Sequence, residues 1–261
     1  MKNIVFIVDI DLGGDGRWAS SRRTPYEYSI KSWSKWCKKN DCELFVLNDL
    51  LMPHEQMGIC WQRYYLFDIL EANGINYNQI LSVDADTIVH PDCPNFFNET
   101  NNKFSVVVNN GCYEWTTRSI NEWGDSLFKG KDRVIPWKYF NGGFQITSKD
   151  QIPFYNYVKD YYTKNHKTIY ELSAKIKAGT DQTIINYLAK EFEEDINYLP
   201  ECYNLQDLCR KSLLHIEGAW FPDELIFLQA GWVYHFNAIP KNPRHVEYWM
   251  ERTYKELYGK L

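Results

Sequence analysis

The strongest constraint on the fold is the alternation of strands and helices over the first hundred residues. Residues 3–8 form a continuous apolar run of the kind that a parallel sheet buries on both faces. Amphipathic helices are predicted from Pro25 onward and over 61–72, and further strands over 43–47 and 79–83. This order predicts parallel strands joined by right-handed crossovers, with ligands bound beyond the carboxyl ends of the strands.

The second half of the chain is predicted to be more mixed. We see no internal repeat, low-complexity tract or linker, so we expect one α/β domain over residues 1–261. Its mixed, Rossmann-like central sheet should carry helices on both faces. The expected strands are 104–109, 144–147 and 233–236, and the expected helices are 152–162, 183–192 and 246–257.

Composition narrows the range of partners and compartments. The formal net charge of −5 gives no overall attraction to nucleic acid, so we expect no nucleic-acid partner. No apolar stretch approaches the roughly 20 residues of a membrane span. The seven cysteines show no zinc-like spacing, which favours reduced thiols in a cytoplasmic protein. Aromatic residues reach 16%, and such rings suit stacking on sugars or bases, although most are expected to pack in the core.

Two carboxylates separated by one residue follow the predicted strand over 79–83. Asp84 and Asp86 should point the same way in an extended chain, where they repel each other unless a cation lies between them. Mg²⁺ or Mn²⁺ accepts carboxylate oxygens and keeps positions for phosphate oxygens. An isolated Asp-x-Asp is commonly a solvated turn, but its place at a strand end after two βα units favours the metal interpretation.

Four segments together resemble the GT-A glycosyltransferases, in particular the family-8-like group of nucleotide-sugar transferases. They follow the order of that family and span nearly the whole chain. The segments are Val83-Asp84-Ala85-Asp86-Thr87-Ile88-Val89, Tyr139-Phe140-Asn141-Gly142-Gly143-Phe144-Gln145-Ile146, Thr180-Asp181-Gln182, and His235-Phe236-Asn237 with Lys241.

The resemblance implies a GT-A fold and a reaction. Residues 1–100 would bind a nucleotide sugar, most often a UDP-sugar, and residues 101–261 would bind a glycan, lipid-linked or protein acceptor. Asp84, Asp86 and His235 would ligate the metal, and an imidazole ligand favours Mn²⁺ over Mg²⁺. The resemblance leans towards retention of configuration, with Asp181, Asp125 or Glu217 left as candidate bases for an inverting reaction.

The same resemblance assigns the remaining site residues. Asp181, Gln182 and Asn141 would lie at the sugar and acceptor. The residues themselves predict Thr180 as a helix cap and 141–143 as a tight loop before a strand. The residues implied to contact the donor are Val8, Asp9, Ile10, Arg63, Asp84, Ala85, Asp86, Gly142, Gly143 and Lys241. Alternative interpretations are a surface position for Arg63 and Lys241, helix capping by Asp181, a β-bulge at the glycines and a half-buried histidine at 235.

Other functions and placements remain open at this point. The segment Asp11-Leu12-Gly13-Gly14-Asp15-Gly16-Arg17 loosely resembles the signature of sugar-phosphate nucleotidyltransferases, although the Thr-Arg expected after the third glycine is absent. A catalytically silent sugar-binding relative is a second alternative. The predicted helix 246–257 has one apolar stripe, which fits packing on its own domain or contact with a membrane.

Overall fold

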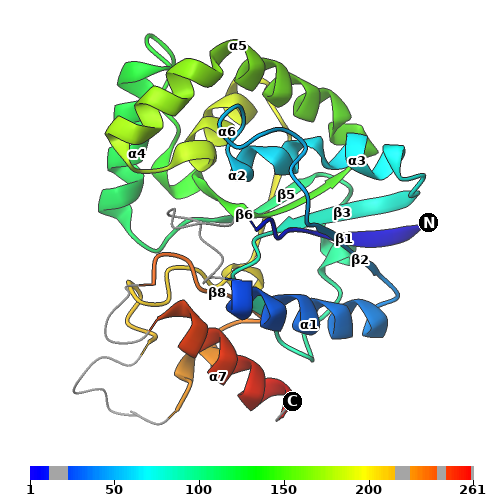
Figure 1. Ribbon diagram of the computed structural model, residues 1–261. Coiled ribbons are helices and arrows are strands. Elements are labelled where there is room, and N and C mark those ends of the chain that lie inside the picture. The colour runs from blue at the N-terminus through cyan, green and yellow to red at the C-terminus, as the bar shows by residue number, and fades with distance from the viewer. Residues whose placement is uncertain (12–22, 215–223, 240–244, 260–261) are drawn as a thin grey trace.

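A six-stranded sheet forms the centre of the molecule, seen in a computed structural model that describes residues 1–11, 23–214, 224–239 and 245–259 (Figure 1). The strand order is β2-β1-β3-β6-β5-β7. Strand β6 is antiparallel to both of its neighbours, and the other strands share one direction. The strands are β1 (Lys2–Val8), β2 (Glu43–Leu47), β3 (Tyr77–Val83), β5 (Phe104–Val108), β6 (Phe140–Ser148) and β7 (Ile196–Leu199).

Both faces of the sheet are covered by helices, as the apolar strands require. On β1, Ile4 and Phe6 pack into one core, while Val5 and Ile7 pack into another on the opposite face. Helices α2 to α6 lie on the first side, and α1 lies on the second (Figure 1). The helices are α1 (Arg23–Lys39), α2 (Ile59–Gln62), α3 (Leu66–Ala72), α4 (Tyr113–Ser126), α5 (Ile152–Ile176), α6 (Thr180–Glu191) and α7 (Val246–Tyr258). The predicted mixed α/β class is confirmed.

Several predicted boundaries were wrong for identifiable reasons. The helix expected over 61–72 is interrupted by the 3₁₀ turn η2 (Arg63–Tyr65), which separates α2 from α3. The helix expected over 152–162 continues as α5, because Ile169 and Ile176 extend its buried side. Helix α1 begins at Arg23, before Pro25.

The prediction of a loop at residues 141–143 was also wrong. Strand β6 begins at Phe140, and all nine of its residues are buried. The backbone remains in the sheet through this segment, with Val83 opposite Phe144 and the Asp84 N–H donating to the Gly143 carbonyl at 3.0 Å. The two glycines therefore lie inside the strand, where their missing side chains leave room for neighbouring groups, and not at a change of chain direction.

A second, two-stranded sheet joins distant parts of the chain. Strand β4 (Thr87–Val89) pairs antiparallel with β8 (Val233–His235), and Thr87 lies opposite His235. Residues 205–214 and helix α7 pack around this pair in a third apolar core.

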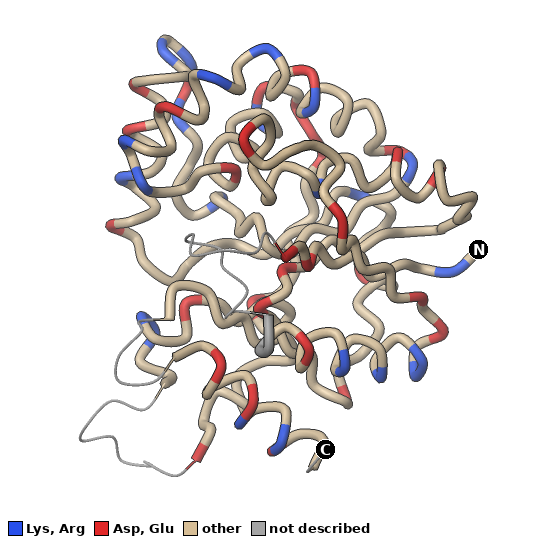
Figure 2. Tube along the Cα trace, viewed as in Figure 1, with Lys and Arg blue, Asp and Glu red and all other residues tan. Residues whose placement is uncertain are grey.

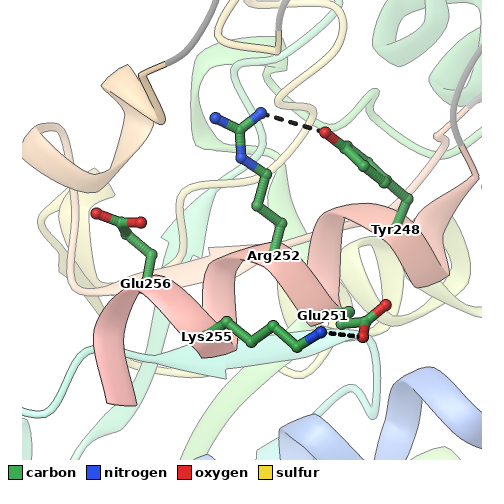
Figure 3. A pocket seen from close by; sticks show the side chains of 5 residues that line it. All are labelled: Tyr248, Glu251, Arg252, Lys255 and Glu256. Carbon is green, nitrogen blue, oxygen red and sulfur yellow. Dashed lines mark hydrogen bonds and ion pairs between the residues drawn. The ribbon is translucent and has the colours of Figure 1, made fainter. Parts of the chain in front are cut away.

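Helix α7 turns its apolar stripe towards the protein. Trp249, Met250 and Tyr254 are buried, and the Tyr254 ring lies 5.5 Å from the Tyr28 ring of α1. Its outer face carries polar pairs such as Lys255 Nζ with Glu251 Oε1 at 2.5 Å (Figure 3). The stripe that suggested two interpretations therefore packs on its own protein. Among the described residues, no helix combines the length and apolarity that a bilayer crossing needs.

Candidate metal centre and active site

The turn between β3 and β4 presents the two carboxylates. Backbone and side-chain hydrogen bonds hold this turn: the Asp84 N–H donates to the Gly143 carbonyl at 3.0 Å, and Thr87 Oγ1 donates to the Asp84 carbonyl at 2.7 Å. The buried indole of Trp33 donates to Thr87 Oγ1 at 3.0 Å. Because the turn is anchored on both sides, Asp84 and Asp86 keep fixed positions beyond the carboxyl end of β3.

The β4–β8 pairing brings His235 to the same point. The Phe236 N–H donates to the Asp86 carbonyl at 2.8 Å, and the His235 N–H donates to the Leu205 carbonyl at 3.0 Å. As a result, His235 Nε2 lies 3.1 Å from Asp86 Oδ1 and 3.5 Å from Asp84 Oδ2. The predicted proximity of His235 to Asp86 is confirmed, and the histidine is 1% exposed rather than half-buried.

These three side chains fit the requirements of a divalent cation. One ligand atom of each lies within 4.8 Å of the others. His235 Nε2 is buried and faces the two carboxylates, whereas the Asp84 and Asp86 side chains are 29% and 26% exposed. Two carboxylates and one imidazole are ligands that divalent cations accept, and the partly exposed carboxylates leave an approach from solvent. Acidic positions gather at the middle of the molecule, near these strand ends (Figure 2).

The pKa values of His235 and Asp84 show that the two carboxylates favour a positive charge between them. Burial alone would lower the pKa of His235, but Asp86 and Asp84 outweigh burial and raise that pKa to about 10. Burial would raise the pKa of Asp84, but Arg63 and His235 hold it below its ordinary range. The two carboxylates therefore favour the protonated form of His235 when no metal is bound.

Arg63 is a buried partner of Asp84 and not a surface arginine. Its guanidinium donates to Asp84 Oδ1 at 2.5 Å, to the Gly142 carbonyl at 2.9 Å and to the Cys60 carbonyl at 3.1 Å. The interrupted helix at η2 places it there. With Oδ1 held by Arg63, the other oxygen of Asp84 faces His235. The contact of Arg63 with a donor, implied by the resemblance, stays a prediction.

The double glycine lets β6 approach the metal ligands. A methyl group added to Gly143 would lie 2.3 Å from Asp84 Oδ2 and 2.6 Å from His235 Cε1. Gly142 is less restricted, since its added methyl would lie 3.3 Å from Gln182 Cβ. Gly143 is therefore required by the ligand positions themselves.

The predicted acceptor residues form a second layer around β6. Asn141 is 3% exposed, and its amide takes part in four hydrogen bonds with protein groups. Gln182 Oε1 accepts the Gly142 N–H at 3.0 Å. Burial raises the pKa of Asp181, an effect opposed by the positive charge of Arg63. Thr180 is the first residue of α6, and the cap is Gly179 with φ of 59°, so the predicted Thr180 cap was wrong.

The remaining predicted residues lie near the end of β1, on α4 or outside the described residues. Val8 and Ile10 are half-buried beside the first core, and Asp9 is buried with its N–H donating to the Leu47 carbonyl at 3.0 Å. Asp125 is exposed on α4, where it pairs with Arg133. Lys241, Glu217 and the Gly-rich segment over 12–17 lie outside the described residues.

Sequence reasoning missed Asn204, which touches a metal-site ligand. Asn204 follows the 3₁₀ turn η6 (Glu201–Tyr203) and is fully buried. Its Oδ1 lies 3.1 Å from His235 Nδ1, and its Nδ2 donates to Asn141 Oδ1 at 3.0 Å. A single asparagine in an irregular segment carries no local pattern that could have identified it.

Comparisons with known proteins identify the fold. No protein-family model matches the chain, and no curated protein matches its sequence. A solved glycosyltransferase involved in the glycosylation of the major capsid of PBCV-1 superposes with a TM-score of 0.56 at 10% identity, covering 95% of this chain and 98% of that one. The chain has a glycosyltransferase fold.

A second solved structure agrees with this result. The glycosyltransferase GlyE of Streptococcus pneumoniae TIGR4 superposes with a TM-score of 0.51 at 14% identity, over 96% of this chain. The match spans 60% of the length of GlyE. Both likenesses concern the arrangement of elements, so the chemistry must be argued from the site.

Proposed function

We propose that this protein is a metal-dependent, family-8-like GT-A glycosyltransferase. It moves a sugar from a nucleoside diphosphate sugar, with UDP-sugars the first donors to test, to a hydroxyl of a glycan, lipid-linked or protein acceptor. The observation that carries the proposal is the convergence of Asp84, Asp86 and the buried Nε2 atom of His235 at the strand ends of a glycosyltransferase fold.

The proposed metal ion would be held by three side chains and supported by two neighbouring residues. Asp84, Asp86 and His235 would hold Mn²⁺, or Mg²⁺ with weaker preference, each through one atom. Bound there, the cation supplies positive charge that stabilises the leaving diphosphate. Arg63 holds Asp84 in a single orientation, and Gly143 leaves the space in which both ligands meet.

The residues around the ligands would bind the two substrates. We propose that Val8, Asp9 and Ile10 lie at the nucleoside, since they end β1 beside β3. Asp181, Gln182 and Asn141 would lie at the transferred sugar or acceptor. We extend the proposal to the two halves of the chain. Residues 1–100, together with Lys241, would bind the donor, and residues 101–261 would bind the acceptor.

The cysteines bear on where this activity takes place. All seven are free, and several are buried thiols such as Cys37, whose pKa burial raises to about 12. We propose a reducing, cytoplasmic environment for the protein, in which such thiols persist. Labelling of the intact protein in cell extracts with a thiol reagent, before and after reduction, tests this.

Donor hydrolysis is the most direct test, because it needs no acceptor. The purified protein is incubated with a panel of nucleoside diphosphate sugars and Mn²⁺, and release of the nucleoside diphosphate is measured. We expect release from one donor class and its loss with excess chelator. Activity that survives the chelator would contradict the metal mechanism.

Calorimetry and a pyrophosphate-release assay, run beside donor hydrolysis, separate the alternatives. A silent sugar-binding relative would bind a donor in calorimetry and release no diphosphate. A nucleotidyltransferase would consume a nucleoside triphosphate with a sugar 1-phosphate and release pyrophosphate.

A further inference from the structure

A chain of amide hydrogen bonds leads from the β6 backbone to His235, and its direction can be determined atom by atom. The backbone N–H of Gly143 can only donate, so the Asn141 atom that it contacts at 2.9 Å must be Oδ1. The same oxygen lies 3.0 Å from an amide atom of Asn204, which must therefore be the donor Nδ2.

A second backbone group fixes the other end of the Asn141 amide. The Gly142 N–H donates at 3.0 Å to Gln182, so the contacted atom is Oε1. Asn141 reaches that oxygen at 3.2 Å and Asn109 Oδ1 at 3.3 Å with Nδ2. Two independent N–H groups thus give the same orientation of Asn141, and neither amide can be reversed without losing a buried hydrogen bond.

The orientation of Asn204 then decides the state of the imidazole. With Nδ2 turned to Asn141, Asn204 presents Oδ1 to His235 Nδ1 at 3.1 Å. An amide oxygen only accepts, so Nδ1 must carry a proton. In the neutral ring the lone pair is then on Nε2, the buried atom that faces Asp84 and Asp86.

We propose that Asn204 is a positioning residue that holds His235 in the tautomer able to bind a metal through Nε2, and that Asn141 holds Asn204. The proposal rests on the metal site of the proposed function. Asn204 and Asn141 are 0% and 3% exposed, so water does not readily replace either amide. Loss of such an outer partner of a metal-bound histidine typically lowers metal affinity about 10- to 100-fold.

Mn²⁺ affinity, measured by electron paramagnetic resonance without any donor, tests the proposal. Asn204→Leu removes the acceptor at similar volume and should weaken Mn²⁺ binding about 10- to 100-fold. Asn204→Asp keeps an acceptor for Nδ1 but sets an oxygen against Asn141 Oδ1. It should lower the melting temperature while keeping Mn²⁺ affinity within about threefold of wild type.

A matched control separates this role from the general effect of losing a buried amide. Gln79 is 5% exposed and donates to the Phe97 carbonyl at 3.0 Å, and it lies near the start of β3 rather than at the site. Gln79→Leu should lower stability without changing Mn²⁺ affinity. A folded Asn204→Leu variant that binds Mn²⁺ like wild type overturns the proposal, and so does affinity loss that follows stability across all three variants.

Nitrogen-15 spectra of the wild-type protein loaded with diamagnetic Zn²⁺ test the tautomer even where Asn204→Leu does not fold. The His235 signals are assigned by their absence in His235→Gln. A proton on Nδ1 with Nε2 bound to the metal is expected, and the reverse assignment overturns the proposal. Wild-type protein that binds neither ion would contradict the metal site itself, whereas the variant comparison concerns Asn204 alone.

Discussion

Gly143→Ala is the most incisive test of the site, because it adds one methyl group between two metal ligands. That methyl would lie 2.3 Å from Asp84 Oδ2 and 2.6 Å from His235 Cε1. Carbon atoms normally contact their neighbours at about 3.5 Å, so the overlap is on the order of 1 Å at both ligands. Neither ligand can move freely, since Arg63 holds Asp84 and the β4–β8 pairing holds His235.

The substitution is expected to affect stability, metal binding and catalysis together. Overpacking of this kind typically costs about 1–3 kcal/mol of unfolding free energy. Displacing a reacting group by about 1 Å reduces catalysis roughly 100-fold. We expect Mn²⁺ affinity to fall at least about tenfold, which corresponds to roughly 1.4 kcal/mol.

The neighbouring glycine supplies the control. In Gly142→Ala the added methyl would meet Gln182 Cβ at 3.3 Å, a much milder overlap that requires α6 to yield by only a few tenths of an ångström. Mn²⁺ titration and thermal unfolding of both variants, together with donor hydrolysis, measure the difference. If Gly143→Ala binds Mn²⁺ and hydrolyses donor like wild type, the ligand geometry described above is wrong.

Three further predictions concern the charged groups. Asp86→Asn should abolish donor hydrolysis and lower Mn²⁺ affinity without unfolding the protein; circular dichroism and Mn²⁺ titration check this, and full activity would refute it. In the metal-free protein, the raised pKa of His235 predicts a stabilising contribution that is fully present below about pH 6.5 and lost as pH rises through about 10. Urea unfolding in chelator at several pH values should show this loss of stability in wild type and not in His235→Gln. The same dependence of unfolding free energy on pH in both proteins would count against the prediction. Arg63→Met should destabilise the protein by about 1–3 kcal/mol, because it removes the arginine partner of the partly exposed Asp84 carboxylate. Denaturant unfolding measures that change, and a value near zero would show that Arg63 does not support Asp84.

The sequence predicted the features that depend on local residue patterns and on the position of a residue along a strand. The apolar run of β1 and the βα alternation led to the α/β class, and the pair Asp84 and Asp86 was recognisable from its place after β3. His235 could be joined to them only through the resemblance, because no local rule predicts that β8 pairs with β4.

Other features depend on tertiary packing and have no local signature. Arg63 looks like an ordinary polar position of a helix until the turn at η2 is known, and only then is it placed beside Asp84. The glycines at 142 and 143 suggested a loop, because a sequence cannot show that two side chains from elsewhere fill the space beside a strand. The role of Asn204 depends on its contacts with His235 and Asn141, which are distant in the sequence.

The pairing of β4 with β8 also has a consequence for how the protein matures. Until the C-terminal segment has been synthesised and docked, the chain has Asp84 and Asp86 but no His235 beside them, and two close carboxylates repel each other. Metal bound at all three ligands stabilises only the docked arrangement, by mass action. Metal binding would therefore require that β8 has been synthesised and paired with β4, and it would stabilise this long-range pairing.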